Sequence, residues 1–548
     1  MLRPTPFGEV PPETARVARA AFRKGNLYLR IRDELGVLFQ DSDFEAMFSM
    51  TGRPAVAPWR LALITLFQFL EHLPDRQAAD AVRSRLDWKY ALGLELTDSG
   101  FDFSLLSDFR ARLIEHGQES LLLDTLIEKF ILQGWIKVRG KQRTDSTHVI
   151  GAVRRLTRLE LLGETMRAAL NELASADPEW LRPQITEALV KRYGHRVEEG
   201  RLPKGEAKRE RYAVEIGQEG FALLDQLDQV KAAHLRELTA VQTLRLIWSQ
   251  QFLCDVEGKT LRWVAWTDAI PASERPASPY DPDTRFATKG ETKWQGYRVH
   301  LSETCEPDQP ELITHVHLAP APQHDSQALP DIHTELIGHG MTPEYHLVDS
   351  GYMSAGLLTS SQKQGIGLIG PPRERHNWQE RTEGAFTHRD FRIDWERHDV
   401  LCPQGFLNKS WVETVDSVGT PVVLVQFRRR TCERCEVREK CTKADRNKGG
   451  RNLLLRREAE FHALQAARDA HHSGEHAPLY ALRSGIEATM SQSVRRCDLR
   501  HARYRGQAGM RLQALGTAAA LNLLRLDCWT QGVPRGETRV ARFVKLSA

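Results

Sequence analysis

The 548-residue sequence lacks any hydrophobic run that approaches 18 residues, so we expect no membrane-spanning helix. Its first ten residues, MLRPTPFGEV, contain no apolar segment of the kind that forms the centre of a secretory signal. Neither sign of charge is in large excess, because 76 Lys and Arg residues are nearly balanced by 72 Asp and Glu residues. The net charge is +4. Total charge therefore does not indicate nucleic-acid binding, and only local clusters of charge are informative.

Cysteine is rare, with eight in the whole chain, and the absence of a signal segment favours a reduced, cytoplasmic setting. Cys432 and Cys435 have the two-residue spacing of zinc ligands, and Cys402 and Cys441 could complete a tetrahedral four-thiolate site. Unliganded thiols explain the same spacing equally well. A redox pair fits less well, because the flanking sequence is not a strand–helix–strand unit.

Helical periodicity dominates two long segments of a chain long enough for two to four domains. Residues 1–135 read as short helices joined by tight turns, with four arginines expected to be exposed: Arg83, Arg85, Arg110 and Arg112. This pattern predicts either a DNA-binding helical module or a plain helical bundle. Residues 153–250 are also helical in pattern, and their Pro and Gly breaks indicate a helical insertion.

Strand patterns lie before and after the helical insertion. A short strand is expected around Asp145, and residues 296–301 and 312–318 alternate with the period of two that strands show. Residues 345–352 read as an apolar strand that ends at Asp349 and a glycine turn. The order of strands and helices indicates an α/β fold, in which functional residues lie at the carboxyl ends of strands. An ordinary turn or capping aspartate also explains both acids.

One face of a predicted helix near the end of the chain carries Tyr480, Arg483 and Glu487 at positions i, i+3 and i+7. Carboxylates hold hard divalent cations and arginine holds phosphate, so the face suggests a metal and phosphodiester site. A solvated face with an Arg483–Glu487 pair explains the spacing too. The densest basic cluster of the chain follows directly, and its candidate phosphate-binding residues are Arg495, Arg496, Arg500, Arg503 and Arg505.

Taken in order, these segments resemble the bacterial insertion-sequence transposases of the DDE class. The chain segment that ends in Phe109-Arg-Ala-Arg-Leu113 resembles their amino-terminal InsH-type domain. Thr144-Asp145-Ser-Thr resembles the first catalytic block, Asp349-Ser-Gly-Tyr352 the second, and Tyr480-x2-Arg483-x3-Glu487 the third. A lysine of the family pattern falls at position 494, which is valine here, and Arg495 and Arg496 follow it.

The resemblance implies an α/β fold: an RNase H-like catalytic core, with a mixed sheet flanked by helices. An all-α amino-terminal domain, a helical insertion and a small Cys-rich insertion would be added to this core. The implied segments are an InsH-type DNA-binding domain (1–135), the first core strand (136–152), the helical insertion (153–250), the main part of the core (251–370), the cysteine-containing insertion (371–455), and the end of the core with the catalytic-glutamate and C-terminal helices (456–548).

The implied activity is cleavage of the ends of an insertion sequence and their transfer to new DNA, by two-metal phosphodiester chemistry. Asp145, Asp349 and Glu487 would hold Mg²⁺ or Mn²⁺, Tyr480 and Arg483 would position phosphate, and the cysteines would hold structural Zn²⁺. The expected partners are the terminal inverted repeats and target DNA, both double-stranded, bound by a homodimer in the cytoplasm at the nucleoid. A catalytically inactive DNA-binding regulator derived from a transposase is one alternative, and an RNase H-like nuclease without strand transfer is another.

Overall fold

The computed structural model describes residues 2, 4, 8–49, 51–52, 54–254, 260–373, 378–445 and 449–533. The chain forms a mixed α/β structure that divides into two compact units. The first unit comprises Met1–Lys137, Asp145–Gln323 and Glu487–Ala548, and the second comprises Val138–Thr144 and His324–Ile486. Among the described helices, none is both long enough and apolar enough to cross a membrane.

The first unit begins with a group of helices, as the periodicity of residues 1–135 predicts. The helices α3 (Pro58–Leu70) and α6 (Ser104–Glu115) are central to it, and nearly every residue of α3 is buried. The other α-helices of this group are α1 (Pro12–Ala21), α2 (Leu27–Arg30), α4 (Asp75–Ser84), α5 (Leu86–Leu92) and α7 (Leu121–Leu132). Proline at the first position of α3 suits a helix start, because its missing N–H would be unsatisfied there anyway.

Two of the four arginines predicted to be exposed in these helices have structural roles instead. Arg110 is buried, and its guanidinium donates a 2.6 Å hydrogen bond to the carboxylate of Asp75. Arg85 is half-buried between the carboxylates of Glu71 and Asp87. The prediction of exposure was wrong for both, because the acids that pair with them lie on neighbouring turns and helices. Arg83 and Arg112 are exposed.

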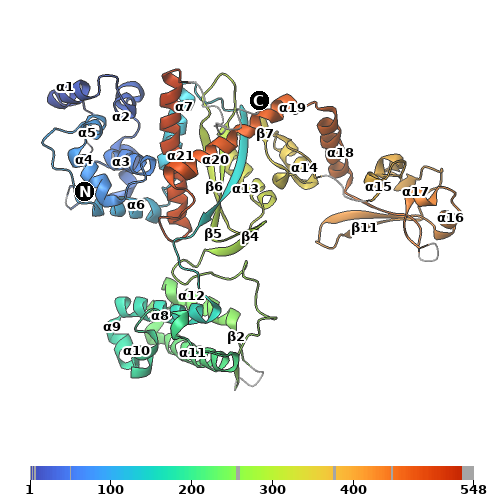
Figure 1. Ribbon diagram of the computed structural model, residues 1–548, viewed down its shortest axis with the longest axis horizontal. Helices are drawn as coiled ribbons and strands as arrows, with labels where there is room; N and C mark the ends of the chain where they lie inside the picture. The colour runs from blue at the N-terminus through green and yellow to red at the C-terminus, as the bar shows by residue number, and fades with distance from the viewer. Residues whose placement is uncertain are drawn as a thin grey trace, which may run out of the picture. The chain divides into compact units, whose positions relative to one another are not determined.

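The sheet of the first unit is built on β1 (Lys141–Ile150), which enters this unit at Asp145. The strand order is β4 (Arg285–Lys289), β5 (Thr292–Thr304) and β1, and β6 (Ile313–Pro320) pairs with β5. Both β4 and β6 are antiparallel to β5. The helix α21 (Gln507–Thr530) packs on β6 and also on α3 and α7 (Figure 1).

The helical insertion has a hydrophobic core of its own within the first unit. Its α-helices are α8 (Arg158–Ala176), α9 (Pro178–Leu181), α10 (Glu187–Tyr193), α11 (Glu206–Leu227) and α12 (Thr239–Gln251). Trp248 on α12 fills the space beside Gly220 on α11, and a side chain at Gly220 would overlap the indole. The antiparallel strands β2 (Phe252–Cys254) and β3 (Leu261–Trp263) follow these helices.

The second unit contains the parallel part of the sheet. The first residues of β1 pair in parallel with β7 (Tyr345–Leu347), which pairs in parallel with β8 (Gly367–Ile369). The α-helices of this part are α13 (Asp325–Gly338), α14 (Ala355–Lys363), α18 (Glu458–Ser473) and α19 (Ala477–Ala481). The helices α13 and α14 begin directly after His324 and Ser354.

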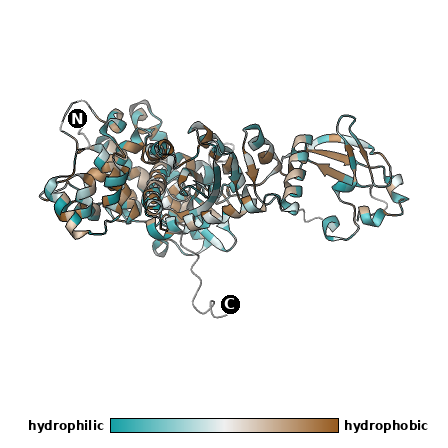
Figure 2. Cartoon of the chain, turned by 90° about the horizontal axis from the view of Figure 1, so that it is seen from above, coloured by the Kyte–Doolittle hydropathy of each residue, from teal (hydrophilic) through white to brown (hydrophobic). Residues whose placement is uncertain are grey.

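The cysteine-bearing segment of the second unit forms a small β-structure that the sequence pattern did not indicate. Its antiparallel sheet consists of β11 (Ser410–Val415), β12 (Pro421–Gln426) and β13 (Asn452–Leu455). The other elements of the segment are β9 (Arg392–Asp394), β10 (Asp399–Leu401), α15 (Trp378–Arg381), α16 (Arg429–Glu433) and α17 (Arg438–Cys441). Its strands are coloured mainly as hydrophobic in Figure 2, and Val423, Val425 and Leu453 belong to its buried core.

Candidate functional site

Asp349 lies at the carboxyl end of the parallel strand β7, where the sequence pattern predicts it. Its Oδ1 accepts a 2.7 Å hydrogen bond from the backbone N–H of Gly351, so Asp349 caps the 3-10 turn Ser350–Tyr352. A side chain at Gly351 would lie 2.8 Å from this Oδ1 and 3.1 Å from Oδ2 of Asp325. The two carboxylates therefore approach one another across a glycine that leaves no room for a Cβ.

Asp325 is a further candidate site residue, which the sequence pattern did not indicate. It is the first residue of α13 and is only 8% exposed, which is unusual for an acidic side chain. The helix N-terminus favours its negative charge, but the neighbouring Asp349 opposes it. Two adjacent carboxylates are a suitable pair of oxygen ligands for Mg²⁺. The acid directly after His324 was visible in the sequence, yet nothing there indicated that α13 returns to the end of β7.

A buried chain of polar side chains lies beneath this end of the sheet. Thr144 Oγ1 lies 2.6 Å from His346 Nε2, and His346 Nδ1 lies 2.8 Å from His333 Nε2. His333 Nδ1 in turn lies 3.5 Å from the hydroxyl of Ser361. These contacts tie β1, β7, α13 and α14 together next to Asp349. Burial lowers the pKa of His333 to about 4, so this histidine is neutral near pH 7.

The buried His333 predicts a loss of stability in mild acid. A histidine in the unfolded chain has a pKa of about 6.5, so between pH 6.5 and 4 only the unfolded chain takes up this proton. The stabilisation present above pH 6.5 is therefore lost as the pH falls towards 4, by up to about 3 kcal/mol. We expect His333→Asn to reduce the slope of unfolding free energy against pH in this window, measured by urea denaturation.

The matched control for this measurement is His471→Asn, which replaces an exposed histidine of α18. Its slope should equal that of the unchanged protein. His148 of β1 also has its pKa lowered to about 4 by burial and by the nearby Arg500, so some slope should remain in the His333 variant. An unchanged slope in His333→Asn would contradict the burial of a neutral His333.

The predicted single helix through Tyr480, Arg483 and Glu487 is interrupted. Tyr480 lies on α19, Arg483 lies on a 3-10 turn (Leu482–Gly485), and Glu487 lies in the first turn of α20 (Ile486–Cys497). The prediction of one continuous helix face was therefore wrong. The break has a physical cause in β1, because the buried Arg143 donates a hydrogen bond to the carbonyl oxygen of Leu482. Its guanidinium also occupies the space that a Cβ at Gly485 would fill.

Within the first unit, a buried ion pair holds α20 in place. Arg525 of α21 donates a 2.7 Å hydrogen bond to Glu303 of β5, whose side chain is completely buried. Thr489 of α20 donates a 2.5 Å hydrogen bond to the same Glu303 oxygen and accepts one of 2.7 Å from Arg525. Thr489 is two residues from Glu487. The position of the candidate catalytic glutamate in its own unit therefore depends on this buried network.

The five candidate phosphate-binding arginines lie on the last turn of α20 and directly after it, and two of them are used inside the fold. Arg500 donates hydrogen bonds to His148 Nε2 (2.9 Å) and to the hydroxyl of Thr147 (3.2 Å), both on β1. Arg503 donates a hydrogen bond to the carbonyl oxygen of Leu73. These contacts explain the two arginines without a phosphate. The other three are exposed: Arg495, Arg496 and Arg505.

The four candidate zinc ligands, Cys402, Cys432, Cys435 and Cys441, are free thiols around one cavity of about 30 Å³. Cys402 Sγ accepts a hydrogen bond from the N–H of Phe406, and Cys432 Sγ accepts one from the N–H of Arg451, both at 3.4 Å. Burial raises the pKa of the Cys441 thiol to about 11. Within either unit, no three His, Cys, Asp or Glu ligand atoms of described residues lie within 4.8 Å of one another. The four thiols therefore line one cavity but are not arranged as a tetrahedral set of metal ligands.

The structure thus distributes the candidate carboxylates over its two units. Asp145 and Glu487 are each the first residue of a segment of the first unit, and Asp349 belongs to the second. Asp145 Oδ1 accepts a 2.7 Å hydrogen bond from the N–H of Ser146. Tyr480 and Arg483 also belong to the second unit.

Two family models match the chain. The model described as "Transposase DDE domain" matches residues 401–527, and the model described as "Transposase domain (DUF772)" matches residues 16–112. The first range contains the cysteines, Tyr480, Arg483 and Glu487, and the second contains the helices α3 to α5 and most of α6. Neither the curated proteins nor the solved structures contain a match to this chain.

Proposed function

We propose that this chain cleaves the ends of its insertion sequence and joins them to target DNA. The two family matches identify the chain as an insertion-sequence DDE transposase. The matched DDE domain belongs to metal-dependent polynucleotidyl transferases. The proposed catalytic carboxylates are Asp145, Asp349 and Glu487. The core that carries them would be RNase H-like.

The observation that carries this proposal is the register of the parallel pair β1 and β7. Lys141 pairs with Tyr345 and Arg143 with Leu347, so each residue of β1 pairs with the residue 204 positions later. The same 204 positions separate Asp145 from Asp349. Asp145 lies within β1, two residues beyond this pairing, and Asp349 lies two residues beyond the end of β7, so the register places the two acids at equivalent positions along adjacent parallel strands, as an RNase H-like active site requires. The pairing therefore supports a joint role for the two carboxylates.

The carboxylates suit a pair of divalent cations, because oxygen ligands with full negative charge are those that Mg²⁺ and Mn²⁺ prefer. When bound, such cations activate the attacking oxygen and stabilise the leaving oxygen of an in-line phosphodiester displacement. Asp349 presents one carboxylate oxygen to Gly351 and can use the other as a ligand. Tyr480 and Arg483 would position the phosphate, and the exposed Arg495 or Arg496 would take the role of the family lysine.

The proposed partners are the double-stranded terminal repeats and the target DNA. The amino-terminal helices would bind DNA through exposed arginines such as Arg83 and Arg112, and two chains would act on the two ends of one element. The protein would work in the cytoplasm at the nucleoid.

One experiment separates this function from its two alternatives. The purified chain is incubated with Mg²⁺, a labelled element end and a supercoiled target plasmid, and the products are resolved on a denaturing gel. A transposase produces both nicked ends and ends joined to the plasmid. A nuclease without strand transfer produces only the nicked ends, and a regulator binds the labelled end without any cleavage. Either of the last two results would contradict the proposal.

We also propose that the four thiols around the small cavity hold structural zinc. The donors suit the metal, because thiolates are preferred zinc ligands and the backbone N–H groups directed at Cys402 and Cys432 stabilise negative sulfur. The pKa of Cys441, raised to about 11 by burial, implies a protonated thiol at pH 7 without metal. A bound dication would lower this pKa, and small side-chain rotations would close the site.

Metal analysis of the purified chain tests the zinc proposal. We expect about one zinc per chain, reduced to near zero in Cys432→Ser, with a lower melting temperature after chelation. Cys254→Ser is the matched control, since this exposed cysteine lies outside the cluster and should leave the zinc content unchanged. A zinc content near zero in the unchanged protein would contradict the site.

A further inference from the structure

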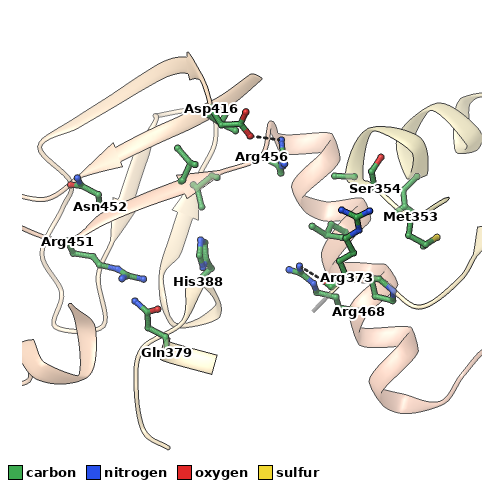
Figure 3. Close-up of a pocket in the computed structure, with 17 residues that line it drawn as sticks. Met353, Ser354, Arg373, Gln379, His388, Asp416, Arg451, Asn452, Arg456 and Arg468 are labelled. Atoms are coloured by element: carbon green, nitrogen blue, oxygen red, sulfur yellow. Dashed lines mark hydrogen bonds and ion pairs between the residues drawn. The ribbon is translucent and has the colours of Figure 1, made fainter. Parts of the chain in front are cut away.

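A cleft of about 520 Å³ lies within the second unit, between the small β-structure and the helices α14 and α18. Figure 3 shows its two walls facing one another. Arg451, Gln379 and His388 lie on the wall formed by the β-structure, and Arg468, Arg373 and Ser354 lie on the opposite wall. The lining comes from segments spread over about a hundred residues of the chain.

The charge in the cleft is strongly unbalanced. Four of its lining residues are arginines, namely Arg373, Arg451, Arg456 and Arg468, and Asp416 is its one acidic residue among those described. Asp416 lies 3.8 Å from Arg456, close enough for an ion pair. Arg468 donates a 3.3 Å hydrogen bond to the main-chain carbonyl oxygen of Arg373, and the acid nearest to it, Glu380, does not line the cleft. The arginines therefore give the cleft a net positive charge.

Arg451 is the most informative of these residues. It is only 9% exposed, and its Nε has no hydrogen-bond partner among the described residues. Its other guanidinium nitrogens face the amide oxygen of Gln379 once that amide is turned, and no described carboxylate forms an ion pair with it. A buried positive charge is costly without a nearby anion, and the nearest groups that could become anionic are the thiols of Cys432 and Cys441 on the side of the β-structure. An anion in the cleft would offset this cost.

The rest of the lining indicates which kind of anion fits. Among the described lining residues there is no Phe, Tyr or Trp, so the cleft offers no surface on which a base could stack. Ser354 and Asn452 add neutral hydrogen-bond donors to the guanidinium groups. Arginine forks match the paired oxygens of a phosphate group. The lining therefore suits the phosphates of a nucleic-acid backbone and not the bases.

We propose that this arginine cleft binds the phosphodiester backbone of DNA, through Arg373 and Arg468 on one wall and Arg451 on the other. The choice of DNA rests on the proposed transposase function, whereas the preference for phosphate rests on the cleft itself. Contacts of this kind position DNA without reading its sequence. The cleft would therefore hold DNA beyond the recognised end or in the target.

Salt-dependent DNA binding tests the proposal without any cleavage. The full chain, in EDTA, is titrated onto a fluorescein-labelled duplex with the element end, and anisotropy gives the affinity between 50 and about 300 mM salt. Each phosphate contact in duplex DNA contributes about 0.9 to the slope of log affinity against log salt. We expect Arg468→Gln to reduce the slope by about 0.9 and Arg373→Gln/Arg468→Gln by about 1.8. Loss of one contact corresponds to about eightfold weaker binding at 0.1 M salt, if the salt plots of the variant and the unchanged chain meet near 1 M.

Arg397→Gln is the matched control, because this arginine is 81% exposed on the same β-structure and lies outside the cleft. Its slope should equal that of the unchanged chain. Parallel salt plots for the double variant and the unchanged chain would overturn the proposal. So would a calorimetric titration in which inorganic phosphate saturates the cleft at millimolar concentration while DNA affinity does not change, since that result identifies a site for a small anion.

The outcomes also separate this proposal from the transposase function. An unchanged slope in a chain that still cleaves element ends overturns only the cleft as a DNA site. A reduced slope in a chain that cleaves nothing overturns only the catalytic function.

Discussion

Asp349→Asn is expected to abolish cleavage of element ends while leaving DNA binding within about twofold of the unchanged chain. The amide oxygen of asparagine can still accept the hydrogen bond from the N–H of Gly351, so the turn after β7 should persist. The substitution removes only the negative charge that a divalent cation requires. Loss of a charged group that acts in the transition state costs about 10³-fold in rate or more. The measurement is the initial rate of nicking of a labelled end in Mg²⁺.

Two further variants sharpen this result. Asp325→Asn removes the buried carboxylate on the other side of Gly351 and should also reduce the rate, since the carboxylates of Asp325 and Asp349 lie close together. Asp331→Asn is the matched control, because this exposed acid lies on the same helix α13 and should leave the rate unchanged. Full activity of Asp349→Asn would show that the carboxylate is only a turn cap. Equal loss in Asp331→Asn would indicate a general effect of charge.

Arg525→Met is expected to cause a large loss of stability, because it removes one member of the buried Arg525–Glu303 ion pair. Glu303 would keep its negative charge in a fully buried position after losing its ion pair with Arg525, while Thr489 would still donate a hydrogen bond to it. Removing one member of a buried ion pair costs about 3–5 kcal/mol, because the other charge remains without compensation. The measurement is the free energy of unfolding from urea denaturation.

A double substitution tests whether an uncompensated buried charge causes the loss of stability. Glu303→Gln/Arg525→Met removes both charges, so its loss should be smaller than the sum of the two single losses. Arg511→Met is the control, since this exposed arginine lies on the same helix α21 and should change the stability by less than about 0.5 kcal/mol. A loss below about 1 kcal/mol for Arg525→Met would contradict the buried network.

The elements that the sequence predicted well are those with strong local patterns. The alternating residues 296–301 lie in β5, and residues 312–318 lie in β6 except for Leu312. Such patterns work because a strand or an amphipathic helix reveals its buried face through the spacing of its own apolar residues. The three-stranded sheet β11–β13 was missed, since its strands come from separated parts of an insertion with little periodicity.

The roles of individual charged residues were harder to predict. Arg110 and Arg500 look like exposed basic residues in the sequence, yet one pairs with Asp75 and the other binds Thr147 and His148. A charge cluster along the chain indicates DNA only when its members stay on the surface. Their partners lie up to 353 residues away, so spacing along the sequence contains no information about them.

By itself the sequence determined the two helical segments, the main strands, the candidate acids Asp145, Asp349 and Glu487, and the resemblance that unites them. Only the tertiary structure decided that Asp325 lies beside Asp349, that Arg143 breaks the helix before Glu487, and that four distant arginines line one cleft. The physical reason is the range of the interactions. Helices and strands form from the spacing of neighbouring residues, whereas sites form where packing joins segments that are remote in the chain.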